Sequence, residues 1–184
     1  MLGKERKICM NEILKALKER RSVRQFRPEL VPEETLNAII EAGLYAASGM
    51  GTQQTKIVAV TNREIRDRLS VLNCQIGGWK EGVDPFYGAP ELLIVLADKS
   101  RPTAVYDGSL VMGNLMLAAH ALGVGSCWIH RAKEEFEMPE GKELLKKLGI
   151  EGDWEGVGHC VLGYPAGDTP PAAPRKEGRV HYLR

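Results

Sequence analysis

Residues 107–122 read DGSLVMGNLMLAAHAL and carry the most apolar helical pattern in the chain. Their leucine, methionine, valine and alanine side chains would surround most of a helix instead of forming one stripe. A helix of this kind is buried, either in a core or in a contact between subunits. We therefore expect this segment to form the central helix of the fold, with part of it covered by a surface beyond one small sheet.

The segments on either side of this helix indicate strands. Residues 92–96, LLIVL, form an unbroken apolar run that is typical of a strand buried on both faces. Glycines at positions 123 and 125 end the helix, and residues 126–129 then predict a short strand. Further strands are expected at residues 57–61 and 158–162, and helices at residues 11–20, 33–47, 64–72 and 141–148.

These elements predict a single α+β domain over residues 1–184, with longer helices packed against a mainly antiparallel or mixed sheet. Prolines at positions 165, 170, 171 and 174 impose an extended course on the last part of the chain. This tail has too few apolar residues to fold on itself, yet residues 180–183 read VHYL and resemble a short strand. We expect residues 165–184 to wrap over a partner chain in a homodimer, where they could extend a sheet edge.

The composition is that of an ordinary globular protein, with 43% hydrophobic and 27% charged residues. The net charge of +1 gives no overall field for nucleic acid or a membrane, and the apolar stretch 110–124 is too short to span a bilayer. Residues 1–20 lack the apolar centre of a secretory signal. The cysteines at 9, 74, 127 and 160 form no CxxC pair, which favours free thiols in a reducing compartment, the cytoplasm.

Four arginines between residues 20 and 27 are the first candidate for a binding site. Guanidinium groups grip a phosphate with paired hydrogen bonds, and Ser22 adds a hydroxyl donor. The alternative is a solvated helix end, where arginine also favours the helix dipole. Both interpretations stay open from the residues alone.

Two glycine-containing segments are further candidates. The loop at residues 46–54 would let its backbone approach a flat ligand, while Ser48 and Gln53 could bond polar ring edges. The alternative is an ordinary flexible turn. Residues 123–128, GVGSCW, lack the lysine of a phosphate loop and precede a strand. A backbone amide donor to a ring nitrogen is the better functional interpretation there, and a helix cap before a core strand is the alternative.

The residue pattern indicates neither a metal site nor a hydrolase active site. The histidines at 120, 130, 159 and 181 are scattered, and no pair has the spacing of metal ligands. His159 and Cys160 are adjacent in an expected strand, so they point to opposite faces and cannot share a metal. No G-x-S-x-G motif of a hydrolase is present.

The order of several short motifs resembles that of the nitroreductase family. Each motif alone is weak, but together they extend over nearly the whole chain. The motifs are LKERRSVRQF at 17–26, residues 46–53, YGAP at 87–90 before an apolar strand, DG at 107–108, GVGSCWI at 123–129 and LGYP at 162–165.

This resemblance implies an intertwined α+β homodimer with two flavin mononucleotide (FMN) sites at the interface. The implied contacts are Arg20, Arg21, Ser22 and Arg24 for the phosphate and its neighbouring groups; Arg175 and Lys176 closing the phosphate site; Ala47, Ser48, Gly49 and Gln53 from the partner subunit; and Gly125, Ser126 and Cys127 near the ring.

The resemblance also implies an oxidoreductase that uses NADH or NADPH to reduce nitroaromatic, quinone or related acceptors by ping-pong hydride transfer. The flavin N5 carries the hydride, so no side chain is assigned as the catalytic group. An FMN-storage or sensing protein with little turnover, and a flavin-destroying or dehalogenating relative, are alternatives. Gly51 stands where the family often has Asn, and Gln54-Thr55 where it often has Pro-Trp, which affects ring contacts and acceptor choice.

Overall fold

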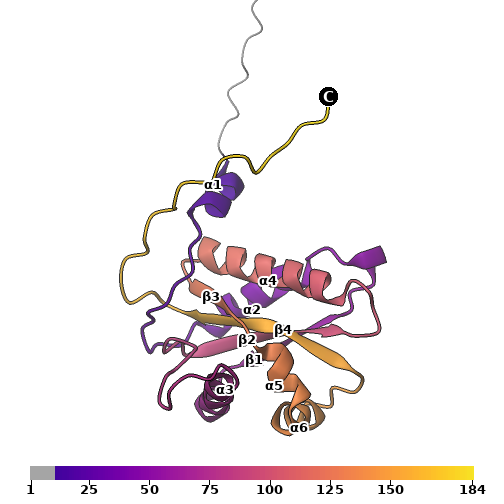
Figure 1. The fold of residues 1–184 in the computed structure, drawn as a ribbon. Coiled ribbons are helices and arrows are strands. Elements are labelled where there is room, and N and C mark those ends of the chain that lie inside the picture. Colours follow the sequence, from indigo (N-terminus) through magenta and orange to yellow (C-terminus); the bar gives the residue numbers. More distant parts are fainter. Residues whose placement is uncertain (1–10) are drawn as a thin grey trace, which may run out of the picture.

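The structure is a computed structural model that describes residues 11–184. Helices and strands alternate along this part of the chain in a single α+β arrangement (Figure 1). In chain order the elements are α1 (Glu12–Glu19), α2 (Glu33–Leu44), the short 3₁₀ helix η1 (Gly49–Gly51), β1 (Thr55–Val60), α3 (Arg63–Ile76), β2 (Glu91–Asp98), α4 (Ala104–Ala121), β3 (Gly125–Ile129), α5 (Ala132–Glu137), α6 (Pro139–Lys147) and β4 (Trp154–Gly163).

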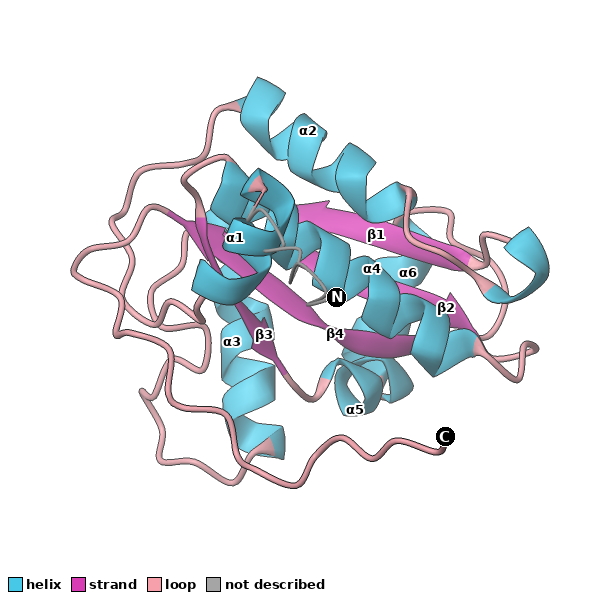
Figure 2. Ribbon diagram, turned by 90° about the horizontal axis from the view of Figure 1, so that it is seen from above, coloured by secondary structure: helices cyan, strands magenta, loops and turns pink. Residues whose placement is uncertain are grey.

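The strands form one sheet in the order β1-β2-β4-β3, and every neighbouring pair is antiparallel (Figure 2). This confirms the mainly antiparallel sheet expected from the sequence. Helices α2 and α4 cover one face, whereas α3, α5 and α6 cover the other (Figure 1). The domain is therefore three layers deep, with the sheet in the middle.

Strand β2 is buried on both faces, as its unbroken apolar run predicts. Leu93 and Val95 belong to the core cluster under α4, while Leu92 and Ile94 belong to the cluster on the opposite face. Alternation of side chains along the strand divides one apolar run between two cores. His159 and Cys160 on β4 are both fully buried, and Cys160 lies in the cluster under α4 while the His159 ring packs on Phe86 of the other cluster.

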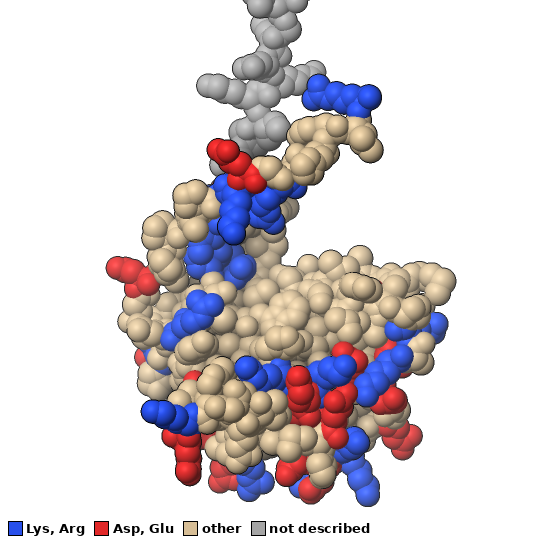
Figure 3. Space-filling model, viewed as in Figure 1, with Lys and Arg blue, Asp and Glu red and all other residues tan. Residues whose placement is uncertain are grey.

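Helix α4 is the central helix expected from residues 107–122, and it starts slightly earlier, at Ala104. It approaches the sheet closely because a Cβ on Gly108 would lie only 2.5 Å from the Val157 side chain. Its outer face stays open, since Tyr106 is 71% exposed and Leu110 is 51% exposed. Figure 3 shows that the surface above this helix carries almost no charge, whereas charged side chains crowd the lower half.

Several boundaries differ from the sequence expectations. Helix α3 continues to Ile76, and α2 ends at Leu44, before the expected end at residue 47. Helix α5 was not expected, because its six residues AKEEFE are too few to show a clear apolar period. Residues 180–183 form no strand within this chain and are exposed. Cys9 lies outside the described residues.

Candidate functional site

The first of the family-like motifs, residues 17–26 and called the opening motif below, lies against the first residues of β3. The Val23 amide donates to the Ser126 carbonyl at 3.0 Å, and Ser22 pairs with Ser126 in an isolated parallel bridge. A Cβ on Gly125 would lie 3.0 Å from the Cβ of Val23, so the glycine permits this close approach. The structure thus brings together two sequence-predicted segments that are far apart in the chain.

The residues just after β4 hold the end of the arginine segment, residues 20–27, by hydrogen bonds. The Arg27 amide donates to the Tyr164 carbonyl at 2.8 Å, and the Arg27 Nε donates to the Pro165 carbonyl at 3.0 Å. The Ala166 amide in turn donates to the carbonyl of Gln25 at 3.0 Å. The LGYP motif therefore positions the arginine segment next to β3.

Three buried side-chain atoms of these two segments have no hydrogen-bond partner among the described residues, namely Arg20 Nη1, Arg21 Nε and Ser126 Oγ. Buried polar atoms are nearly always paired in folded proteins, so unpaired ones indicate a ligand or water. A cavity of about 250 Å³ opens beside the same segment, between residues 22–25 and residues 167–170. Guanidinium and hydroxyl donors around such a space suit a phosphate group.

The neighbouring arginines have different partners. Arg21 donates to the carbonyls of Lys18 and Arg20, so its guanidinium serves the end of α1. The helix-end interpretation therefore fits two nitrogens of Arg21, while its buried Nε has no partner among the described residues. Arg24 is exposed, and its guanidinium carbon lies 6.0 Å from the centre of the Tyr87 ring. No sequence pattern indicated this contact.

The loop around Ser48 lies at the opposite end of α4 (Figure 1). The Gly49 amide donates to Asp107 Oδ1 at 3.0 Å, and Asp107 lies in the first turn of α4. Ser48 Oγ accepts from the Gln53 amide at 2.9 Å. Since β3 follows the last turn of α4, this helix of 18 residues, about 27 Å long, separates the loop from the opening motif. One chain does not bring these two segments together.

The remaining expected site residues are exposed or have side chains directed elsewhere. Ala47, Arg175 and Lys176 are exposed, and Arg175 donates to the carbonyl of Ala173 in its own tail. The Cys127 side chain belongs to the core cluster on the face away from α4, so only its backbone is available to a ligand near Ser126. Burial raises the pKa of Cys160 to about 12, which keeps that thiol protonated.

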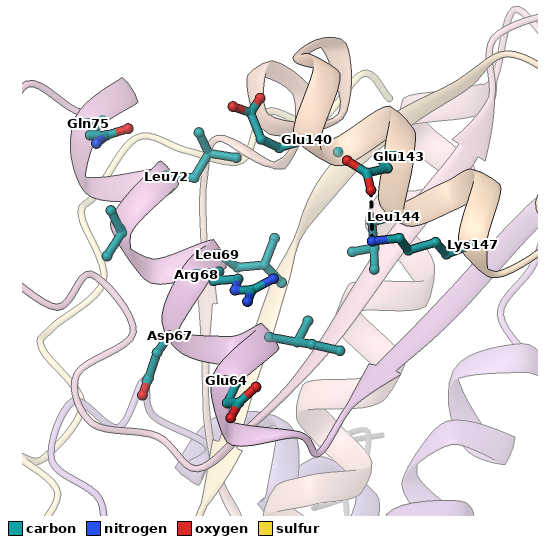
Figure 4. A pocket seen from close by; sticks show the side chains of 13 residues that line it. Glu64, Asp67, Arg68, Leu69, Leu72, Gln75, Glu140, Glu143, Leu144 and Lys147 are labelled. Atoms are coloured by element: carbon teal, nitrogen blue, oxygen red, sulfur yellow. Dashed lines mark ion pairs between the residues drawn. The ribbon is translucent and has the colours of Figure 1, made fainter.

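A larger groove, about 640 Å³ in volume, lies between α3 and α6 (Figure 4). Its floor is apolar, and a Glu143–Lys147 ion pair of 2.8 Å lies on its rim. It contains none of the sequence-predicted site residues. In the described part of the chain no group of His, Cys, Asp and Glu could hold a metal ion, and no helix is long and apolar enough to cross a membrane.

The fold and this site define a class: an α+β protein in which buried polar atoms remain unpaired beside the place where the opening motif meets β3. The family model of the nitroreductase family matches residues 17–75 and 78–164. A nitroreductase from Bacteroides fragilis, solved with bound FMN, is 32% identical, with a TM-score of 0.85, over 95% of this chain and all of its own.

Curated relatives agree with this match. A Methanothermobacter thermautotrophicus protein, named provisionally as an NADH dehydrogenase/NAD(P)H nitroreductase, is 30% identical over 66% of this chain and 62% of its own length. Iodotyrosine deiodinase from Thermotoga neapolitana is 28% identical over 90% of this chain and 94% of its own. The chain belongs to the nitroreductase family.

Proposed function

We propose that the chain binds FMN and uses NADH or NADPH to reduce nitroaromatic, quinone or related acceptors in a ping-pong reaction. The observation that carries this proposal is the contact between Ser22 and Ser126, where the buried Arg20 Nη1 and Ser126 Oγ lack partners. FMN in the related Bacteroides fragilis structure supports the same cofactor here. A reducing cytoplasm suits the buried free thiols.

Different residues would contact the phosphate and the ring of FMN. Arg20 and Ser22 would bind the terminal phosphate, and Arg24 would neutralise charge nearby. The backbone of residues 125–127 would face the ring, since a strand edge offers fixed amide donors. When bound, the flavin supplies the hydride chemistry, and the protein orients it and its partners. A positive environment near the ring would stabilise negative charge on the reduced flavin.

We propose further that each site is shared between two chains. In one chain the loop at Ser48 and the segment at Arg20 lie at opposite ends of α4. A second copy packed antiparallel along α4 would bring its loop, with Ala47, Ser48, Gly49 and Gln53, to the arginine segment. A twofold arrangement builds both sites at once because the contact is the same in both directions.

The surface supports this homodimer. Helix α1 has no buried residue, and its Ile13 and Leu17 are exposed. The surface over α4 carries almost no charge (Figure 3). Contiguous apolar surface of this kind marks interaction sites in folded proteins. The exposed tail, residues 165–184, would wrap over the partner and bring Arg175 and Lys176 to its phosphate site. On this proposal the whole chain is one domain that functions in pairs.

The absorbance spectrum of the purified protein tests the cofactor, and mass analysis of the released compound identifies it. We expect FMN, and anaerobic oxidation of NADH only when an acceptor is added. FAD, or no flavin after reconstitution with FMN, would contradict the proposal. FMN without NADH or NADPH oxidation would favour a storage or sensing protein. The acceptor screen includes an iodinated phenol because one relative is an iodotyrosine deiodinase.

A further inference from the structure

The YGAP motif at residues 87–90 has no part in the function proposed so far. Tyr87 adopts a left-handed backbone with φ of 55°. Bulky residues rarely adopt this conformation, and where they do, surrounding contacts must hold it. Residues held this way cluster at binding and catalytic sites. Glycine would adopt this backbone conformation at lower energetic cost, so the tyrosine side chain itself is expected to have a role.

A half-buried carboxylate, that of Asp84, holds the backbone around Tyr87. The two oxygens of Asp84 accept hydrogen bonds from the Phe86 amide at 2.9 Å and the Gly88 amide at 2.7 Å, one on each side of the tyrosine. Ser70 and Arg66, both on α3, donate to the same carboxylate. Arg66 is itself only 3% exposed. The turn that carries Tyr87 is thus tied to α3 from within the protein.

The Asp84 carboxylate is charged, as its role in holding the turn around Tyr87 requires. Burial opposes the charged form, yet hydrogen bonds from Arg66, Ser70 and the two backbone amides hold the pKa of Asp84 below its ordinary value. The carboxylate is therefore charged throughout the neutral range, and the turn stays closed.

The ring that this turn holds is not part of the core. Tyr87 is 42% exposed, and the Arg24 guanidinium lies over its ring, 6.0 Å from the centre. Arg24 also lines the cavity beside Ser22. A rigid backbone therefore presents a half-exposed aromatic ring at the edge of the candidate cofactor site. A ring that adds little to the core and is still held in place is suited to contact a ligand.

We propose that Tyr87 is a specificity-determining residue, whose ring stacks against planar, electron-poor aromatic acceptors at the FMN site. This inference rests on the proposed function. An electron-poor ring stacks favourably on an electron-rich phenol in an offset arrangement. Compact acceptors without a flat ring, such as ferricyanide, gain nothing from this contact. Asp84 and Arg66 are positioning residues that act through Tyr87.

The test compares Tyr87→Ala and Tyr87→Phe with the wild-type protein loaded with FMN. For nitrobenzene, Tyr87→Ala raises KM by about five- to tenfold, the loss of one aromatic stacking contact, with kcat little changed. Tyr87→Phe keeps the wild-type KM because it keeps the ring. Ferricyanide kinetics and the Kd for FMN stay unchanged in both variants. Tyr87→Gly suits the left-handed backbone and replaces the alanine variant should that variant not fold.

Trp79→Ala is the matched control. Trp79 is also 42% exposed, lies on the same connection, and carries a guanidinium, that of Arg131, at 4.4 Å. We expect its nitrobenzene KM to match wild type. An equal rise in Trp79→Ala, a changed Kd for FMN in Tyr87→Ala, or an unchanged nitrobenzene KM would overturn the inference alone. A wild-type protein that binds no FMN and oxidises no NADH would overturn the proposed function and this inference with it.

Discussion

Arg20, Arg21 and Arg24 are close in sequence but have different contacts. Arg20 and Arg21 each keep one buried nitrogen without a partner among the described residues, but the other two nitrogens of Arg21 donate to carbonyls at the end of α1. Arg24 reaches the Tyr87 ring. Of the two neighbours Arg20 and Arg21, Arg20 is therefore the better candidate to bind a new charged partner beside Ser126. Identical residue types therefore differ in function because each side chain leaves the backbone in a different direction.

Arg20→Ala should weaken FMN binding by roughly 1.5–3 kcal/mol, or one to two decades in Kd, because one charge-assisted phosphate contact is lost. Arg21→Ala is the control, and its smaller effect should be on the stability of α1. Fluorescence titration of the apoprotein with FMN measures both. Equal FMN affinity in wild type and Arg20→Ala would show that Arg20 is part of a solvated helix end.

The sequence predicts the arginine segment as a candidate site but cannot separate Arg20 from Arg21, since both precede the same serine. It also cannot reveal Asp84 or the Arg24–Tyr87 contact, which depend on how α3 and the connection before β2 pack. Such contacts arise from tertiary structure and leave no periodic signal.

At the scale of elements, the length and strength of the apolar pattern determine whether the sequence predicts a helix or strand. The runs in β2 and α4 are long and strongly apolar, so both elements were expected close to their true bounds. The short, charged α5 was missed because six residues carry too little pattern. The position of the Ser48 loop was also not predictable, because it depends on a hydrogen bond from Gly49 to Asp107.

Strand β2 begins with a buried acid that makes stability depend on pH. Glu91 is 2% exposed, and burial raises its pKa although the Val31 amide donates to it at 2.8 Å. A raised pKa means that the neutral form is favoured in the folded state. The associated stability is full below the ordinary value of 4.5 and is lost as pH rises through the raised pKa.

Glu91→Gln removes this titration while keeping an acceptor for the Val31 amide. Urea unfolding of both proteins over a pH series checks the expectation. Relative to the variant, wild type should lose free energy of unfolding as pH rises above 4.5, the ordinary value. A constant difference across the series would contradict the assignment to Glu91.

At the scale of the whole molecule, a single chain is incomplete in two respects. Its proposed site residues lie at the two ends of α4, and its apolar surface over α4 is uncovered. The sequence indicates the second, since residues 107–122 are more apolar than one sheet requires. The division of the site follows from the course of the chain and could be expected only through family resemblance. On the proposed homodimer, a second copy packed along α4 would complete the site and cover the apolar surface together.

Removing residues 165–184 tests the tail. We expect the truncated chain to lose the dimer and FMN together, because in our proposal the tail would wrap the partner and bring Arg175 to the phosphate. Arg175→Ala in the full-length chain is the matched control and should weaken FMN binding while the dimer persists. A truncated chain that dimerises normally without FMN would confine the role of the tail to the phosphate site.

The central claim is an FMN site that two chains build together. Sedimentation velocity followed at the visible absorbance of flavin tests it most directly, because only species that hold flavin are seen. We expect the flavin signal to move with a dimer at every concentration where FMN stays bound, and to be released as dilution separates the chains. An FMN-loaded monomer that still oxidises NADH would contradict the shared site, and a dimer that takes up no FMN would contradict the site itself.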